Sequence, residues 1–328
     1  MKKLHPILIT LVVAAFVFTG LTSCIKDDMD DCPETQLLVK FVPEMYELPE
    51  NEHRIDSVHV YVFDRNDRFV TAWNGGGYDY LSGTGYVVPV DLEPGEYRFV
   101  AWTNPCDSYL FNRSLPECLP QTTTLRDLEL YLDCSADRTF TSDIPDLHYG
   151  VYTGAVVEGG RNQTYIIYLV PNTYRINTTV KGLPVSGDEY RFSVRENNSR
   201  FTFGNAIVSG QDDFQHIRTS RFGQDNRLSA SMRLLSLTDD HCLPEHRLPK
   251  TRAASDRSPQ FAFSNTTTGR VYYSGDLVRM IRKAYESAGQ TVDFDVTYVF
   301  DIELAFDAMM NVTITVNGWT YKYNPTEL

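Results

Sequence analysis

Alternating apolar and polar positions dominate the C-terminal part of the chain. Every even position in residues 294–306 is apolar, and acids or threonine occupy most of the odd positions. A period of two places the two sets on opposite faces, which predicts a strand with one buried and one solvent-facing side. Residues 312–316 alternate again, and Asn317-Gly318 then leads into residues 319–323. Asn-Gly between two such runs predicts a β-hairpin, because both turn positions need a positive φ.

Short runs of the same kind recur along most of the chain. Strands are predicted at residues 37–42, 58–63, 86–92, 97–102, 149–157, 165–170, 174–180, 190–195, 200–203 and 228–237, and Leu128, Leu130 and Leu132 form a further alternating run. Many short strands with turn signals and almost no helix are typical of an all-β protein, here two β-sandwiches in series.

One helix interrupts this pattern, at residues 276–288. Its apolar residues fall on a single stripe, Ser274 can cap its start, and Gly289 can end it. Pro171-Asn172-Thr173 separates two alternating runs, so we place a domain boundary near residue 170. The expected domains are residues 37–170 and residues 171–328, with the helix in the second.

The N-terminus has the layout of a secretory signal, in which a basic start is followed by an apolar run as far as Gly20. Its last residues, Leu21-Thr22-Ser23-Cys24, resemble the lipobox of bacterial lipoproteins. This resemblance implies that residues 1–23 are removed and that Cys24 becomes an acylated first residue held by membrane lipid. Each buried methylene of an acyl chain contributes about 0.8 kcal/mol to such an anchor.

Residues 24–36 follow as an acidic tether. Lys26, Asp27 and Asp28 resemble the signal by which Bacteroides-type bacteria export lipoproteins to the outer face of the outer membrane. A plain solvated charge run is the simpler alternative. Alanine at these three positions is expected to leave the protein lipidated but shielded from added protease.

Net charge narrows the range of partners. The full chain carries −13, and removal of residues 1–23 takes away two lysines and no acid, which gives −15. Such a chain repels nucleic acid, so no nucleic-acid partner is expected.

Five cysteines remain beside Cys24, namely Cys32, Cys106, Cys118, Cys134 and Cys242. An exported protein meets an oxidising compartment, so disulfides are permitted. Because five is odd, at least one thiol stays free or pairs outside the chain. Cys106 and Cys118 flank a short proline-containing loop and are the first candidates for a bridge.

No motif for catalysis, a cofactor or a metal stands out. Residues 241–246 hold two histidines and a cysteine, but Pro244 breaks a helical ligand pair and zinc needs three or four ligands. Carboxylate pairs for glycoside hydrolysis stay open, since their separations cannot be read from sequence. Aromatic side chains at Trp73, Tyr78, Tyr80 and Trp102 could stack on sugars if exposed, although core packing is the commoner role.

Several segments together resemble the FimB-type fimbrillin-anchor lipoproteins, which form the anchor subunit of type V pili in Bacteroides-type bacteria. They are the lipobox with Asp31-Cys32-Pro33, then residues 60–64, residues 92–102 and residues 312–319, and the chain end at Glu327-Leu328. The likeness spans nearly the whole mature chain, and the order and spacing of the segments carry it.

The resemblance implies two transthyretin-like Greek-key sandwiches, no enzymatic activity and a surface-exposed position on the cell outer membrane. It also implies a role in fixing a fimbrium to the cell and limiting its length, with the shaft subunit as partner. Such pili grow by strand exchange, in which a protease cuts an N-terminal strand after Arg and a neighbour's strand fills the groove.

The first arginine after Cys24 is Arg54, beyond the strand predicted at residues 37–42. A cut there would release the body from its lipid, so we expect this chain to keep its first strand and end the polymer. Trp319, Tyr321 and Tyr323 of the last hairpin are the candidate subunit contact. A surface carbohydrate-binding lipoprotein is the alternative function.

Overall fold

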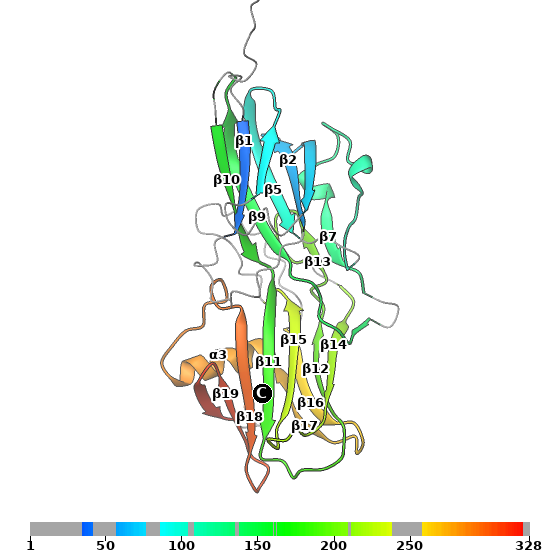
Figure 1. The fold of residues 1–328 in the computed structure, drawn as a ribbon, viewed down its shortest axis with the longest axis vertical. Helices are drawn as coiled ribbons and strands as arrows, with labels where there is room; N and C mark the ends of the chain where they lie inside the picture. The colour runs from blue at the N-terminus through cyan, green and yellow to red at the C-terminus, as the bar shows by residue number, and fades with distance from the viewer. Residues whose placement is uncertain are drawn as a thin grey trace, which may run out of the picture.

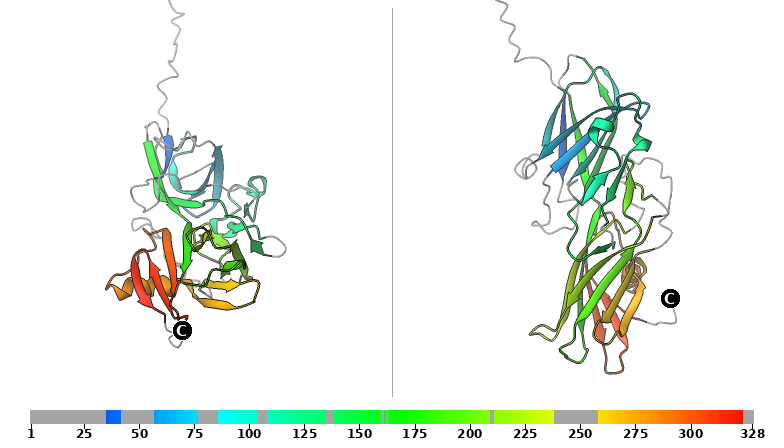
Figure 2. Two further views of the ribbon diagram at one scale, coloured as in Figure 1. Left: turned by 60° about the horizontal axis from the view of Figure 1, so that its bottom comes forward. Right: turned by 90° about the vertical axis from the view of Figure 1, so that its right-hand side faces the viewer.

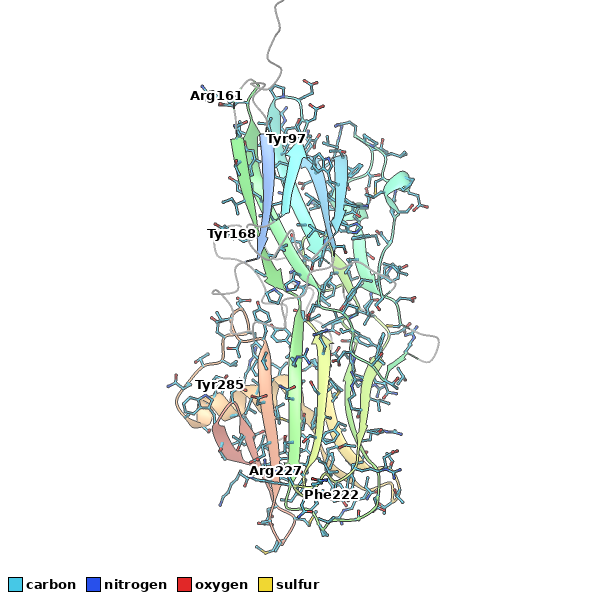
Figure 3. All side chains as sticks on the ribbon, viewed as in Figure 1. Tyr97, Arg161, Tyr168, Phe222, Arg227 and Tyr285 are labelled. Atoms are coloured by element: carbon cyan, nitrogen blue, oxygen red, sulfur yellow. The ribbon has the colours of Figure 1, made fainter. Side chains whose placement is uncertain are left out.

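The computed structural model describes residues 35–41, 57–76, 86–103, 108–134, 138–159, 161, 163–208, 211–237 and 258–323. These residues form two β-rich lobes stacked end to end in an elongated molecule (Figure 1; Figure 2). Tyr97 and Arg161 lie at the end of the first lobe, whereas Phe222 and Arg227 lie at the opposite end of the second (Figure 3).

The first lobe is built on a seven-stranded sheet with the order β3-β2-β5-β9-β10-β1-β4. Its strands are β1 (Thr35–Phe41), β2 (Ser57–Asp64), β3 (Phe69–Gly76), β4 (Tyr86–Val90), β5 (Gly95–Thr103), β9 (His148–Val157) and β10 (Gln163–Pro171). β9 and β10 pair antiparallel at Tyr149–Val170 and His148–Pro171. On their other sides β9 pairs with β5 and β10 pairs with β1.

An insertion between β5 and β9 carries three short strands and two 3-10 turns. They are β6 (Tyr109–Phe111), η4 (Leu115–Glu117), η5 (Leu125–Asp127), β7 (Glu129–Leu132) and β8 (Thr139–Phe140).

The second lobe contains two five-stranded sheets, with the orders β15-β11-β18-β19-β20 and β17-β16-β12-β14-β8. Its elements are β11 (Thr173–Lys181), β12 (Tyr190–Glu196), β13 (Arg200–Thr202), β14 (Phe214–Ser220), β15 (Leu228–Leu235), β16 (Gln260–Asn265), β17 (Val271–Asp276), α3 (Leu277–Ser287), β18 (Val299–Phe306), β19 (Val312–Val316) and β20 (Trp319–Lys322).

The two lobes repeat one topology. The neighbours β3-β2-β5-β9 of the first lobe correspond to β14-β12-β16-β17 of the second, and β4-β1-β10 correspond to β15-β11-β18. In both lobes the first strand lies between an antiparallel neighbour and a parallel one, since β1 pairs with β4 and β10 just as β11 pairs with β15 and β18. The predicted all-β fold with sandwich lobes and one helix in the second lobe is therefore confirmed.

The chain changes from one set of sheets to the other between Pro171 of β10 and Thr173 of β11. Two short segments cross this change of sheet. β13 pairs with β7 of the first-lobe insertion, and β8 of that insertion pairs with β14 of the second lobe. Whether residues 37–170 and 171–328 are separate folding units stays a prediction.

Two local predictions need correction. The alternating run at residues 294–306 becomes a strand only from Val299, because Asp293 accepts hydrogen bonds from the Asp295 and Thr297 amides and folds its start into a turn. Helix α3 begins after Asp276, whose side chain accepts a hydrogen bond from the Arg279 amide at 2.8 Å. Asp276 is thus the N-cap, and Ser274 lies within β17.

Candidate functional site

Several predicted site residues lie outside the described part of the chain. They are the lipidation site Cys24, the export residues Lys26, Asp27 and Asp28, Cys106, and the possible metal ligands of residues 241–246. Cys118 is buried, and burial raises the pKa of its thiol. Its predicted bridge to Cys106 stays a prediction.

The first strand, β1, is fully incorporated into the first lobe. Its residues pair in parallel with β10 from Thr35–Gln163 to Phe41–Leu169, and antiparallel with β4 from Thr35–Val90 to Val39–Tyr86. A strand with neighbours on both sides leaves no vacant position for another strand at that place in the sheet.

The last hairpin forms as its sequence predicts. Asn317 and Gly318 both have positive φ angles, of 47° and 88°, and β19 pairs with β20 from Thr313–Lys322 to Val316–Trp319. The Asn317 side chain also bonds the Asp301 amide at 2.7 Å, which ties the turn to β18. The hairpin therefore extends the sheet that contains β11 and β18, and β20 is its edge strand.

The three aromatic residues of β20 and its continuation have different environments. Trp319 is 39% exposed, and its ring lies 6.4 Å from that of Tyr285 on α3. Tyr321 is partly buried, and burial raises its pKa to about 12. The Tyr323 ring packs 4.8 Å from that of Tyr273 on β17. Only Trp319 is thus well exposed, whereas the two tyrosines face the flank of the sandwich.

One buried pair of titratable side chains lies in the second lobe. Glu196 of β12 and His216 of β14 have fully buried side chains, with His216 Nε2 and Glu196 Oε2 3.5 Å apart. Burial raises the pKa of the Glu196 carboxyl, outweighing the opposite effect of His216. Because solvent cannot reach the pair, it offers no surface for a substrate. Within the described residues, no group of three or more potential metal-ligating acids, cysteines or histidines is arranged to hold an ion.

The aromatic platform expected of a carbohydrate-binding protein does not form around Trp102. That side chain is completely buried, with its ring 4.8 Å from Tyr149. Trp73 is partly buried against the core, and Tyr78 and Tyr80 lie outside the described residues. Of the helices that can be described, none is both long and apolar enough to cross a bilayer.

Two sandwich lobes of one topology, a doubly paired first strand and an edge hairpin define a two-lobed β-sandwich protein. The family described as Fimbrillin-A associated anchor proteins Mfa1 and Mfa2 matches residues 29–325. This chain belongs to that family. It is thus a fimbrial anchor protein rather than an enzyme, and its family implies fimbrial subunits as partners and association with the cell surface and outer membrane.

Solved structures share the fold at low sequence identity. A Bacteroides thetaiotaomicron VPI-5482 protein provisionally described as polysaccharide-binding is 21% identical, with a TM-score of 0.70, over 90% of this chain and 100% of its own. The fimbrial anchor protein Mfa2 from Porphyromonas gingivalis is 18% identical, with a TM-score of 0.64, over 88% and 100%. Another Bacteroides thetaiotaomicron VPI-5482 protein, provisionally described as an adhesin, is 18% identical with a TM-score of 0.66, over 90% and 100%. No curated protein sequence matches the chain.

Proposed function

We propose that this chain is a surface-exposed outer-membrane lipoprotein that holds the base of a fimbrium through an acylated Cys24. The proposal joins the lipobox-like ending of residues 1–23 to membership of the anchor family. Residues 24–36 then act as an acidic tether between the lipid and β1.

The observation that carries the proposal is the double pairing of β1. A shaft subunit that grows by strand exchange must lose its first strand to receive a neighbour's strand. Here β1 is bonded to both β10 and β4, and cleavage after Arg54 would also cut the body from its lipid. A subunit that keeps this strand ends the polymer, so the anchor also limits fimbrial length.

Contact with the shaft subunit involves β-strand interactions at the last hairpin. β20 is an edge strand, and an edge presents unpaired backbone donors and acceptors to another chain. Trp319, with 39% of its surface exposed, would supply an apolar contact beside that edge. A chain without residues 319–328 that is stable and still retains fimbriae would refute this contact.

Deletion of the protein tests the function directly. We expect cells without it to shed long fimbriae into the medium, as seen by electron microscopy and by fimbrillin in the supernatant. Cys24→Ser is expected to give the same shedding with the protein itself released. Attached fimbriae of normal length in the deletion strain would contradict the proposal.

A further inference from the structure

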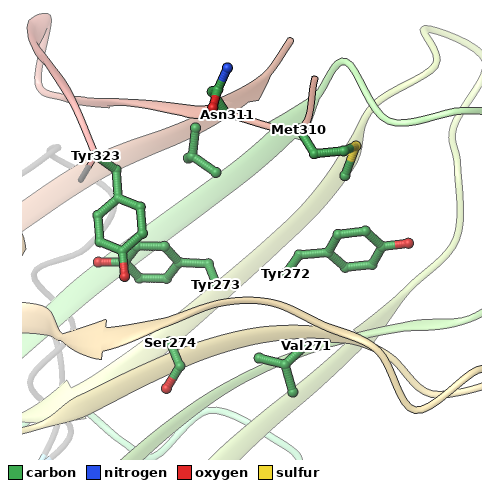
Figure 4. A pocket seen from close by; sticks show the side chains of 8 residues that line it. Val271, Tyr272, Tyr273, Ser274, Met310, Asn311 and Tyr323 are labelled. Carbon is green, nitrogen blue, oxygen red and sulfur yellow. The ribbon is translucent and has the colours of Figure 1, made fainter. Parts of the chain in front are cut away.

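A groove opens on the flank of the second lobe, beside the last hairpin. It has a volume of about 310 Å³ and lies between edge strand β17 and the beginning of β19. Figure 4 shows Tyr273 and Tyr323 together at one end, and Met310 and Tyr272 towards the other. We call it the flank groove, lined by residues 271–274, residues 310–312 and Tyr323.

The groove exists because the two sheets of the sandwich do not bond to each other along this side. β17 ends one five-stranded sheet and β20 ends the other. Helix α3 follows β17 and closes part of the gap, where Ser287 donates a hydrogen bond to the Thr320 carbonyl at 3.0 Å. The part next to the start of β17 stays open, and Val271 there is 59% exposed.

The walls of the groove fit an extended peptide. Among the described residues β17 pairs with β16 alone, so the other edge of this strand, whose residues 271–274 line the groove, presents backbone hydrogen-bonding groups. An added strand would bond to this edge and point alternate side chains inward. Those side chains would meet buried Tyr273 and Val312, with the Tyr323 ring 4.8 Å from that of Tyr273.

Charge at the groove favours an acidic segment, although the chain as a whole carries −13. The Arg270 guanidinium lies 4.9 Å from the centre of the ring of Tyr272, a lining residue of the groove, and the described residues offer it no ion pair. Three nearby acids are already engaged by N–H donors. Asp188, which is close enough to act on Tyr272, accepts from the Asn265 side chain. Asp307 accepts from the Met309 and Asn311 amides, and Asp276 caps α3. Arg270 is therefore available to a carboxylate on the incoming segment.

The groove also lies towards the end of the molecule opposite the start of β1. Tyr272 lies 6.2 Å from Tyr190, whose ring is 5.5 Å from Phe222 at the far end of the molecule. Thr35, where the tether joins β1, pairs with Gln163 at the opposite end, near Arg161 (Figure 3). A partner that extends outward from the cell would meet the groove end first.

We infer that the flank groove receives an extended, acidic segment of the fimbrial shaft subunit, which adds as a strand to the outer edge of β17. The inference rests on the proposed function and deepens it, because the groove that Tyr323 lines beside the last hairpin adds the outer edge of β17 to the contact proposed there. The chain's own residues 324–328 are the competing occupant.

Short overlapping synthetic peptides that tile the mature shaft subunit serve as probes for the full mature protein. We expect at least one acidic peptide to bind and to slow amide hydrogen exchange in β17, as a strand added at that edge must. Val271→Glu places a charge at the mouth and is expected to weaken binding about tenfold or more, an effect of the size seen when a central interface side chain is lost. Val185→Glu is the matched control, since Val185 is also 59% exposed, and it should leave affinity unchanged.

Three results would overturn the inference: no slowed exchange in β17, equal affinity for both glutamate variants, or binding of oligosaccharides with the same loss in Val271→Glu. Much tighter peptide binding after removal of residues 324–328 would assign the groove to the chain's own tail and likewise overturn it. If Val271→Glu cells kept their fimbriae while the deletion strain shed them, the role of the groove would be refuted and the anchor function would stand. Attached fimbriae in the deletion strain would refute the anchor function itself.

Discussion

Gly182, directly after β11, combines a left-handed backbone with a very close neighbour. Its φ is 84°, and a Cβ atom at this position would lie 2.0 Å from the carbonyl oxygen of Phe306. A backbone carbonyl in a sheet cannot move aside as a flexible side chain can. The residue therefore fixes how closely the end of β11 approaches the end of β18.

We expect Gly182→Ala to lower the free energy of unfolding by about 3 kcal/mol or more, because backbone strain and a steric clash add. Gly269→Ala is the matched control. Gly269 has a φ of 73°, but a Cβ atom there would meet nothing within 4 Å, so only the strain of about 1–2 kcal/mol applies. Urea unfolding of both variants measures the difference, and equal losses would contradict this explanation.

Glu196 carries a second residue-scale prediction, which concerns pH. Burial raises the pKa of its carboxyl above 4.5, so the native state binds this proton more tightly than the unfolded state does. The stability that this gives is complete below pH 4.5 and is lost as the pH rises through the raised pKa.

Glu196→Gln removes the titrating carboxyl. We therefore expect the free energy of unfolding to increase by about 1–3 kcal/mol in neutral or alkaline buffer and to change less in acid. Urea unfolding across this range checks the slope. Glu286→Gln, on the exposed side of α3, serves as control and should leave the slope unchanged. If the stability of the wild-type protein rose with pH while that of Glu196→Gln stayed constant, the prediction would be contradicted.

At the scale of elements, β1 and β4 differ in how they tolerate proline. β4 lies at the sheet edge and contains Pro89 naturally, as expected where an N–H can face away from the neighbouring strand. β1 is bonded on both sides. A proline there must break a ladder bond whichever way the replaced N–H points.

We expect Val39→Pro to cost roughly 1–3 kcal/mol for each backbone group left unpaired and to speed hydrogen exchange in β10. Val87→Pro in β4 is the control. Residue 87 is two positions from Pro89, so its N–H points the same way as that of residue 89 would, away from β1. Val87→Pro should therefore lose less stability than Val39→Pro. Equal thermal stability of the two variants would contradict the central position of β1.

At the scale of the whole molecule, the two lobes share one aromatic cluster. Phe203 follows β13, in the second half of the sequence, yet its ring lies 4.8 Å from Tyr61 of β2 and 6.3 Å from Trp102 of β5. Charged contacts also join the lobes, from the insertion of the first lobe to strands of the second. Asp146 pairs with Arg233 of β15 at 2.7 Å.

Phe203→Ala is therefore expected to lower the free energy of unfolding by about 3–5 kcal/mol and to speed hydrogen exchange in β2 and β5 of the first lobe. Phe192→Ala is the control, because its ring packs on Phe263 inside the second lobe. Phe192→Ala should lower the free energy of unfolding by a similar amount without speeding hydrogen exchange in β2 and β5. A fragment of residues 24–171 that folds stably alone would contradict this coupling.

Local pattern was enough to determine the elements whose signal lies within a few neighbouring residues. The alternation of residues 312–316 and the Asn-Gly turn specify the last hairpin, and the apolar stripe of residues 277–284 specifies α3. Both rest on backbone geometry and on periodic burial. The family resemblance likewise came from segments in order, and the family match confirmed it.

Tertiary structure alone decided which segments meet. β14, β16 and β17 are strands that local patterning does not predict, and β8 and β13 pair across the change of lobes. The flank groove depends on two sheet edges, β17 and β20, whose first residues are 48 positions apart in sequence. Such pairings depend on the distant partner that buries each face, whereas a local run of residues encodes only its own periodicity.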